Sequence, residues 1–233
     1  MQINTHSWFS FKYGTIPTRE LLEEARAKNI STLALTDINS TAACLNFVRL
    51  ASAYGIKPVL GIDFRNGAQQ QFVGLARNNE GFKILNDFLS QHLHHKEPIP
   101  ARAPRLENTY IIYPFASQHT DLEENEFIGV APENLNRLRF SRWYKQQDKL
   151  VILQTVTFRN KRDFNAHRLL RAIDNNTLLS KLPKTEEGSL AHSMWTKEKL
   201  TAYFKDYPAL IANTQRLLDH CSIAFDFSKS NHK

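Results

Sequence analysis

Three side chains that could act together in hydrolysis lie close to the ends of apolar runs. His6 lies in the first predicted strand, Asp37 directly follows the second apolar run, and Asp63 closes the third. In a barrel of parallel strands the carboxyl ends of the strands converge, so these three side chains would meet at one mouth. Imidazole and carboxylate groups bind Zn²⁺ and Mn²⁺, which activate water for attack on phosphoesters. The pattern is therefore compatible with a metal ion that activates water.

The periodicity of apolar residues predicts strands that alternate with helices, which is typical of βα units around a parallel sheet. Strands are expected at 2–7, 31–36, 57–63, 71–76, 109–113, 126–130 and 149–156. Helices are expected near 18–28, 40–54, 80–92, 134–145, 161–175, 197–205 and 207–221. Thr18, Ser40 and Asn160 are the predicted N-caps of three of these helices. Seven or so units of this kind favour a barrel.

Composition sets wide bounds. The 233 residues suffice for one barrel-sized domain with its own core, and the net charge of +7 favours anionic partners only mildly. Cys44 and Cys221 are predicted to be buried, reduced thiols. No apolar run approaches the ~20 residues that span a bilayer, and the start of the chain does not read as a signal peptide. We therefore expect a cytoplasmic protein without a membrane partner.

Several motifs carry a resemblance to a known family. The chain reads NTHSWFS at 4–10 and ALTDINS at 34–40. Further along it reads KPVLGIDF at 57–64, LQTVTFRNKRDFNAHRLLRAIDNNTLL at 153–179 and YPALIANTQRLLDHCSIAFDF at 207–227. In this order they resemble the PHP (polymerase and histidinol phosphatase) domain of bacterial DNA polymerase III α subunits, most closely the Bacteroidetes type. The resemblance implies an α/β fold, a distorted, TIM-like (βα)7 barrel over 1–227, with 228–233 as a tail toward a polymerase core.

The resemblance also implies where metal ligands would lie. His6, Asp37 and Asp63 match ligand positions of the family. Four further positions depart from its pattern, since histidine or aspartate is usual where this chain has Asn4, Ile38, Thr155 and Thr157. Ile38 has no donor atom, and hydroxyl or amide oxygens bind transition metals more weakly than imidazole does. We interpret the site as a degenerate relic without a cofactor. One weakly held Zn²⁺ or Mn²⁺ and an intact catalytic cluster are the alternatives.

Two basic segments raise the possibility of nucleic-acid contact. The first contains Arg139, Arg142 and Lys145 beside aromatic residues, and the second contains Arg162 and Arg168. Basic side chains neutralise phosphates, and aromatic rings stack on unpaired bases. Amphipathic helices around a barrel give the same pattern when they are merely solvated, and this alternative is favoured.

The expected function follows from the resemblance. It implies the N-terminal domain of a replicative polymerase subunit, whose Mg²⁺-binding core would lie downstream. Polymerisation needs paired catalytic carboxylates, and no Asp-x-Asp occurs in this chain. The expected role is therefore structural: to support the remainder of the α subunit, which binds DNA, and to dock a proofreading exonuclease subunit. The alternative is a metal-dependent phosphoesterase, either a 3′–5′ exonuclease or a phosphatase.

Overall fold

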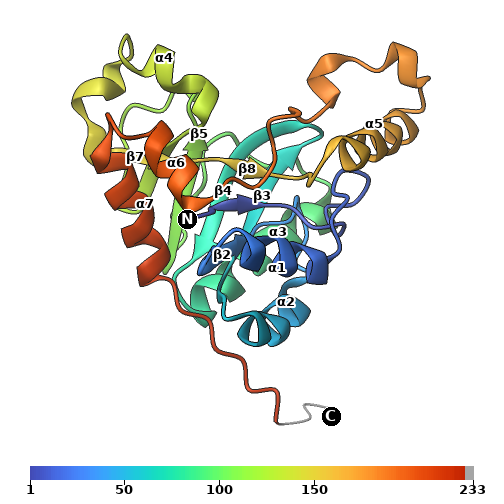
Figure 1. Ribbon diagram of the computed structural model, residues 1–233, viewed down its shortest axis with the longest axis horizontal. Coiled ribbons are helices and arrows are strands. Elements are labelled where there is room, and N and C mark those ends of the chain that lie inside the picture. The colour runs from blue at the N-terminus through green and yellow to red at the C-terminus, as the bar shows by residue number, and fades with distance from the viewer. Residues whose placement is uncertain (229–233) are drawn as a thin grey trace.

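The computed structural model describes residues 1–228, in which helices surround a curved sheet (Figure 1). The strands are β1 (Asn4–Thr5), β2 (Thr32–Leu35), β3 (Lys57–Asn66), β4 (Gln69–Ala76), β5 (Thr109–Pro114), β6 (Glu126–Val130), β7 (Leu150–Ile152) and β8 (Thr155–Val156). The helices are α1 (Thr18–Ala27), α2 (Cys44–Ala51), α3 (Asn79–His95), α4 (Leu135–Leu138), α5 (Lys161–Asp174), α6 (Lys197–Tyr203) and α7 (Pro208–His220). The predicted mixed α/β class is confirmed.

The strands form two sheets that follow one another around a curve. Six strands pair in the order β2-β3-β4-β5-β6-β7, and β1 pairs with β8. The amide of Ala34 donates to the carbonyl of Gln2 at 3.0 Å, and that of Thr36 to Thr5 at 2.9 Å, which joins β1 to β2. β7 and β8 are separated by only two residues of chain. The two sheets therefore form a barrel-like curve, in which the short segment from β7 to β8 links the last strand of the six-stranded sheet to the β1–β8 pair.

One strand breaks the βα repeat. β4 runs antiparallel to both β3 and β5, whereas the other pairings are parallel. It follows β3 through a tight turn, in which Gly67 adopts a φ of +59°, a conformation that favours glycine. No helix separates these two strands, so the predicted seven-fold βα count is not confirmed. The dipeptide Asn66-Gly67 is a strong hairpin signal that the strand predictions did not use.

Two apolar cores hold the helices against the sheets. One lies beneath α1 and α2 and includes Leu21, Phe47 and Leu35. The other fills the space between β3–β7, α3 and α7, with Phe64 and Phe72 among its fully buried side chains. Cys44 and Cys221 are free and buried, as predicted. The described residues contain no helix that is long and apolar enough to cross a membrane.

Helix starts were only partly predictable. Asn160 caps α5 as predicted, because its side chain accepts from the amides of Arg162 and Asp163. Thr18 is instead the first residue of α1, and α2 begins at Cys44, so Thr18 and Ser40 are not the N-caps. The predicted helix at 134–145 is broken into α4 and short 3₁₀ turns. Of the predicted tail at 228–233, only Ser228 lies within the described residues.

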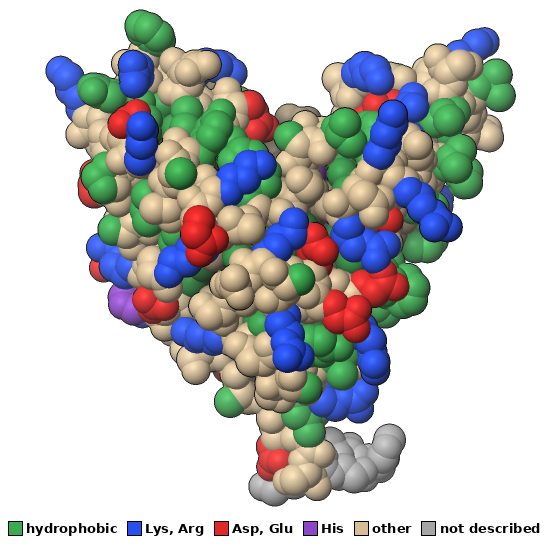
Figure 2. Space-filling model, in the orientation of Figure 1, with side chains coloured by type: hydrophobic (Ala, Val, Ile, Leu, Met, Phe, Trp, Pro, Cys, Tyr) green, Lys and Arg blue, Asp and Glu red, His purple; other side chains and the backbone are tan. Residues whose placement is uncertain are grey.

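Two raised segments stand on opposite sides of the molecule in the view of Figure 1. Residues 132–149, here the α4 lobe, leave the end of β6 and return to the start of β7. Residues 161–190, here the α5 arm, follow β8 and comprise α5 and the loop after it. Figure 2 shows the hollow between these two segments. The candidate site lies at the carboxyl ends of β1, β2 and β8.

Candidate functional site

The centre of the candidate site is a buried ion pair on β3. Asp63 and Arg65 are two residues apart in this strand, so their side chains project from one face. Arg65 Nη2 lies 2.7 Å from Asp63 Oδ2, and the two side chains are 6% and 0% exposed. His6, which directly follows β1, donates from Nε2 to the same oxygen at 2.9 Å. Histidine, carboxylate and guanidinium therefore meet in one buried cluster.

Four donors converge on one oxygen of Asp63. Beyond the bonds from Arg65 and His6, Oδ2 accepts from Asn4 Nδ2 at 3.2 Å and from Gln70 Nε2 at 2.9 Å. Gln70 comes from β4, where it is the register partner of Arg65. The other oxygen, Oδ1, is buried and has no hydrogen-bond partner among the described residues. The cluster is thus a set of N–H groups aimed at an anion.

The electrostatics of this cluster fix its protonation state. Burial alone would raise the pKa of Asp63, but the charge of Arg65 and the hydrogen bond from His6 hold that pKa well below its usual range. Burial lowers the pKa of His6, and its contacts with Asp63 only partly offset this. At neutral pH Asp63 is therefore ionised, whereas His6 is neutral, donating from Nε2 to Asp63 and accepting at Nδ1. Arg65 supplies the positive charge.

Three of the four positions where the resemblance implied a missing ligand, Asn4, Thr155 and Thr157, lie around the same cluster. Thr157 donates to His6 Nδ1 at 3.0 Å. Asn4 donates to Thr155 Oγ1 at 3.1 Å, and these two residues are register partners in the β1–β8 pair. Asn4 also accepts from Thr36 Oγ1 at 2.8 Å. Side chains from β1, β3 and the β8 segment are therefore joined by hydrogen bonds between protein groups. Of the three side chains expected to meet at one mouth, His6 and Asp63 are in contact.

Asp37 makes its bonds elsewhere. Its Oδ1 accepts from the amide of Ser7 at 2.6 Å and from Ser10 Oγ at 2.7 Å, and its Oδ2 accepts from Ser7 Oγ at 2.7 Å. Burial raises the pKa of Asp37, and the serine donors counter this only in part. Ser10 Oγ also accepts from the amide of Ile38 at 2.9 Å. Asp37 therefore organises the turn after β1 through neutral donors.

The side chains at this site do not fit a divalent cation. Three donors already engage Asp37, and Ile38 offers no donor atom to a metal. The N–H groups of Asn4, Arg65 and Gln70 point their hydrogens at Asp63, where a cation would need lone pairs. Within residues 1–228 no group of three or more histidine, cysteine or acidic side chains is arranged to hold a metal ion.

Three residues that complete the cluster escaped prediction. Arg65 and Gln70 contact Asp63 directly, and Asn39 holds Arg65 by accepting from its amide at 3.0 Å and donating to its carbonyl at 2.8 Å. The sequence did contain a signal for Arg65, since Asp-x-Arg in a strand places both charges on one face. Gln70 could be found only once the Asn66-Gly67 hairpin was recognised.

The predicted nucleic-acid residues divide between the two raised segments. Arg139, Arg142 and Lys145 are exposed on the α4 lobe. Arg162 is exposed near the start of α5, whereas Arg168 is half-buried and pairs with Glu187 at 2.8 Å. The charge of Arg168 is therefore paired within the α5 arm, where the ion pair links α5 to the loop that follows it.

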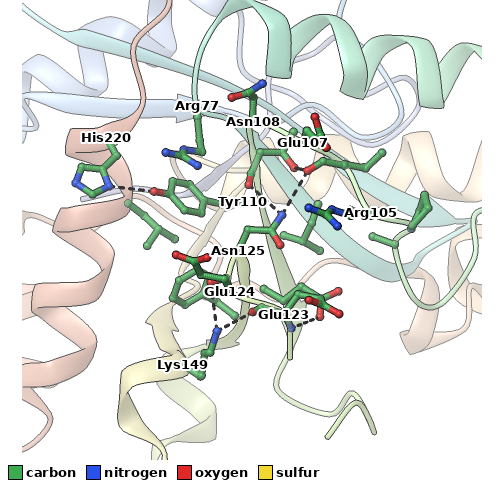
Figure 3. Close-up of a pocket in the computed structure, with 18 of the residues that line it drawn as sticks. Arg77, Arg105, Glu107, Asn108, Tyr110, Glu123, Glu124, Asn125, Lys149 and His220 are labelled. Atoms are coloured by element: carbon green, nitrogen blue, oxygen red, sulfur yellow. Dashed lines mark hydrogen bonds between the residues drawn. The ribbon is translucent and has the colours of Figure 1, made fainter. Parts of the chain in front are cut away.

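A cavity of about 1070 Å³ lies at the opposite end of the strands. Tyr110, Glu126 and Lys149, which line it, come from the amino ends of β5, β6 and β7. In Figure 3 the hydroxyl of Tyr110 bonds to His220 Nδ1 at 3.0 Å, while the guanidinium of Arg77 lies 5.3 Å from the Tyr110 ring. None of the predicted ligand positions lines this cavity. Its walls carry both acidic and basic side chains, so it presents no charge of a single sign.

The sheet of this chain is curved and mostly parallel, and histidine and acidic residues lie at the carboxyl ends of its strands. These features are typical of barrel-like α/β folds, whose sites lie at the strand ends. Within this class the chain belongs to the PHP domain family, whose sequence profile matches residues 2–131. An amidohydrolase from Chromobacterium violaceum shares 22% identity over 41% of this chain and 34% of its own, with a TM-score of 0.33. That overlap is too small to bear on the fold.

Two full-length relatives match almost the whole chain. The DNA polymerase III subunit alpha of Halalkalibacterium halodurans is 22% identical and is matched by 98% of this chain. That of Escherichia coli (strain K12) is also 22% identical and is matched by 96% of this chain. The match takes in only 23% of the length of either relative. The predicted family resemblance is confirmed.

Proposed function

We propose that this chain is the PHP domain of a replicative DNA polymerase III α-type subunit, in which an internal ion pair stands in place of the family's metal site. The supporting observation is the contact between Arg65 and Asp63. A guanidinium buried 2.7 Å from the central carboxylate supplies the positive charge that a metal ion would otherwise bring. The domain then has a structural role in DNA replication, without phosphoesterase chemistry of its own.

The partners proposed for the domain follow from the relatives it resembles. A domain with a closed, hydrogen-bonded centre can support the remainder of the polymerase α subunit and dock a proofreading exonuclease subunit through its surface. DNA would then be bound by the complete polymerase, whose Mg²⁺ would reside in its own core. The competing function, a metal-dependent exonuclease or phosphatase, requires Asp63 to bind a cation although Arg65 already occupies its Oδ2.

The decisive experiment is metal analysis after stripping with chelator and re-equilibration with Zn²⁺ or Mn²⁺. We expect less than one equivalent of metal, with no change in His6→Gln. Surface zinc on the adjacent His94 and His95 is removed by the paired variant His94→Gln/His95→Gln, which serves as the matched control. One or more equivalents that survive in this control and disappear in His6→Gln would overturn the proposal. Metal-dependent hydrolysis of a phosphoester, abolished by Asp37→Asn, would establish the competing function.

A further inference from the structure

The central part of the α4 lobe carries only cationic charged side chains, and the exposed acidic residues Glu133 and Asp148 flank it on either side. Residues 134–147 contain four cationic side chains, Arg137, Arg139, Arg142 and Lys145, and no aspartate or glutamate. All four are exposed, and within residues 1–228 none of them forms an ion pair with an acidic side chain. The lobe thus differs from the α5 arm, where Arg168 and Arg171 are paired with acidic side chains.

An aromatic ring projects from the middle of this basic stretch. The side chain of Phe140 is 92% exposed, and that of Tyr144 is 47% exposed. Between them Trp143 is buried, with only 3% of its side chain exposed, and anchors the turn in the core. Leaving a phenylalanine in water sacrifices the free energy of its burial, so a ring held outward among cations suits a ligand that has both flat faces and negative charge.

The guanidinium groups are oriented by contacts with the body of the domain. Arg142 donates to the carbonyl of His119 at 2.7 Å, and its guanidinium lies 4.7 Å from the ring of Trp143. Arg139 donates from Nε to the hydroxyl of Tyr207 at 3.4 Å. Each arginine has five N–H donors and uses only one of them in these bonds, so the others remain available for phosphate oxygens.

From these observations we infer that the α4 lobe binds single-stranded nucleic acid, with Phe140 stacking on a base and the surrounding cations contacting phosphates. Aromatic rings and an unpaired basic surface are the two elements by which proteins hold single strands without reading their sequence. An acidic peptide would use the cations but would gain little from an exposed phenyl ring. The inference rests on the chemistry of the lobe and is independent of what the metal analysis finds.

The test is fluorescence anisotropy with a labelled oligo-dT of about 20 nucleotides, long enough for one single-strand site. We expect salt-dependent binding that Phe140→Ala weakens about fivefold or more. The variant Arg139→Gln/Lys145→Gln should weaken binding and reduce the dependence of log K on log salt by about one to two phosphate contacts. An oligo-rU of the same length shows whether DNA or RNA is preferred, and either preference supports the inference.

Two matched controls make the result specific. Phe11→Ala removes an aromatic side chain that is 81% exposed but lies outside the lobe. Arg26→Gln/Arg49→Gln removes the same charge from exposed positions on α1 and α2. The inference is overturned if oligo-dT does not bind at low salt, or if both lobe variants bind as the controls do. It is also overturned if polyglutamate competes fully and Phe140→Ala has no effect, because the ligand would then be an acidic protein.

Discussion

Two buried carboxylates in neighbouring parts of this domain are stabilised in opposite ways. Asp63 is held by a full positive charge, and its pKa lies well below the usual range despite its burial. Asp37 is held by serine hydroxyls and one backbone amide, and burial raises its pKa. The difference shows that a single residue, Arg65, sets the charge balance of the Asp63 region. Asp37 is stabilised without a charged partner, because the turn after β1 places three hydrogen-bond donors around its carboxylate.

The largest expected effect comes from removing the charge beside Asp63. Arg65→Met should lower the free energy of unfolding by about 3 to 5 kcal/mol, because it leaves a buried carboxylate without its partner. Chemical denaturation monitored by circular dichroism measures this. The exposed pair of Lys83 and Asp87 is the matched control, and Lys83→Met should leave the free energy of unfolding almost unchanged.

A second variant guards against a trivial loss of packing. In Asp63→Asn/Arg65→Met both charges are gone, so stability should recover in part relative to Arg65→Met alone. If the double variant is as unstable as the single one, the contrast between the two carboxylates is not electrostatic in origin.

The next effect concerns His167, which packs against Tyr13, a residue whose ring also faces Arg65 at 4.9 Å. Its Nδ1 donates to the carbonyl of Tyr13 and its Nε2 accepts from the amide of Gly188, so both ring nitrogens are bonded within the fold. Burial lowers the pKa of His167 from 6.5 to about 4. The folded state therefore binds fewer protons than the unfolded state between these values.

The stabilisation linked to His167 is thus fully present above the unfolded pKa of 6.5 and is lost as pH falls toward about 4. The loss amounts to at most about 3 kcal/mol. Unfolding measured from pH 7 to 4 should show a shallower decline in His167→Gln than in the parent chain. Parallel curves for the two proteins would mean that another group, such as His192, carries the acid sensitivity.

A smaller effect is expected at the second carboxylate. Asp37→Asn places an amide where three donors converge, which should cost about 1 to 3 kcal/mol. Because the donors come from the turn at Ser7 and Ser10, the loss should appear as faster hydrogen exchange of the Ser7 amide. Asp63→Asn, which uncovers the Arg65 charge, should be the more damaging of the two substitutions. An equal cost for both would erase the distinction between them.

The smallest effect tests the hydrogen bonds around His6. Thr157→Val keeps the shape of the side chain but removes the hydroxyl that donates to His6 Nδ1. We expect a loss of about 1 kcal/mol in the free energy of unfolding. Thr155→Val, at a half-buried position whose hydroxyl accepts from Asn4, should cost no more than Thr157→Val. A larger cost for Thr155→Val would show that the position of Asn4 depends on its bond to Thr155.

The sequence predicted the elements of the fold well, because strands and helices are written in local periodicity. The positions of β1–β6 and of α1, α3, α5 and α7 were found to within a few residues. The direction of β4 was missed, since strand direction depends on the connection and not on the strand itself. The start of α1 at Thr18 was found, although its N-cap is Pro17, whereas the start of α2 at Cys44 was missed by four residues.

The convergence of strand ends predicted that His6, Asp37 and Asp63 would meet. His6 and Asp63 are in contact, whereas Asp37 bonds within the turn after β1. The function of the cluster was harder to foresee, because Arg65 lies outside the positions that the family pattern draws attention to. A comparison of ligand positions shows which metal-binding side chains are missing. It does not show which side chain supplies the positive charge beside Asp63. That required the register between β3 and β4, which brings Gln70 beside Arg65.

The position of Arg65 also determines where the positive charge beside Asp63 comes from. The stability gained from a bound ion rises and falls with the free concentration of that ion. Arg65 lies in the same strand as Asp63, two residues further on, so its positive charge is present in every folded molecule at a fixed effective concentration. With the function proposed above, the Asp63 region would need no loading step after synthesis, and its charge balance would not depend on the divalent-ion content of its surroundings.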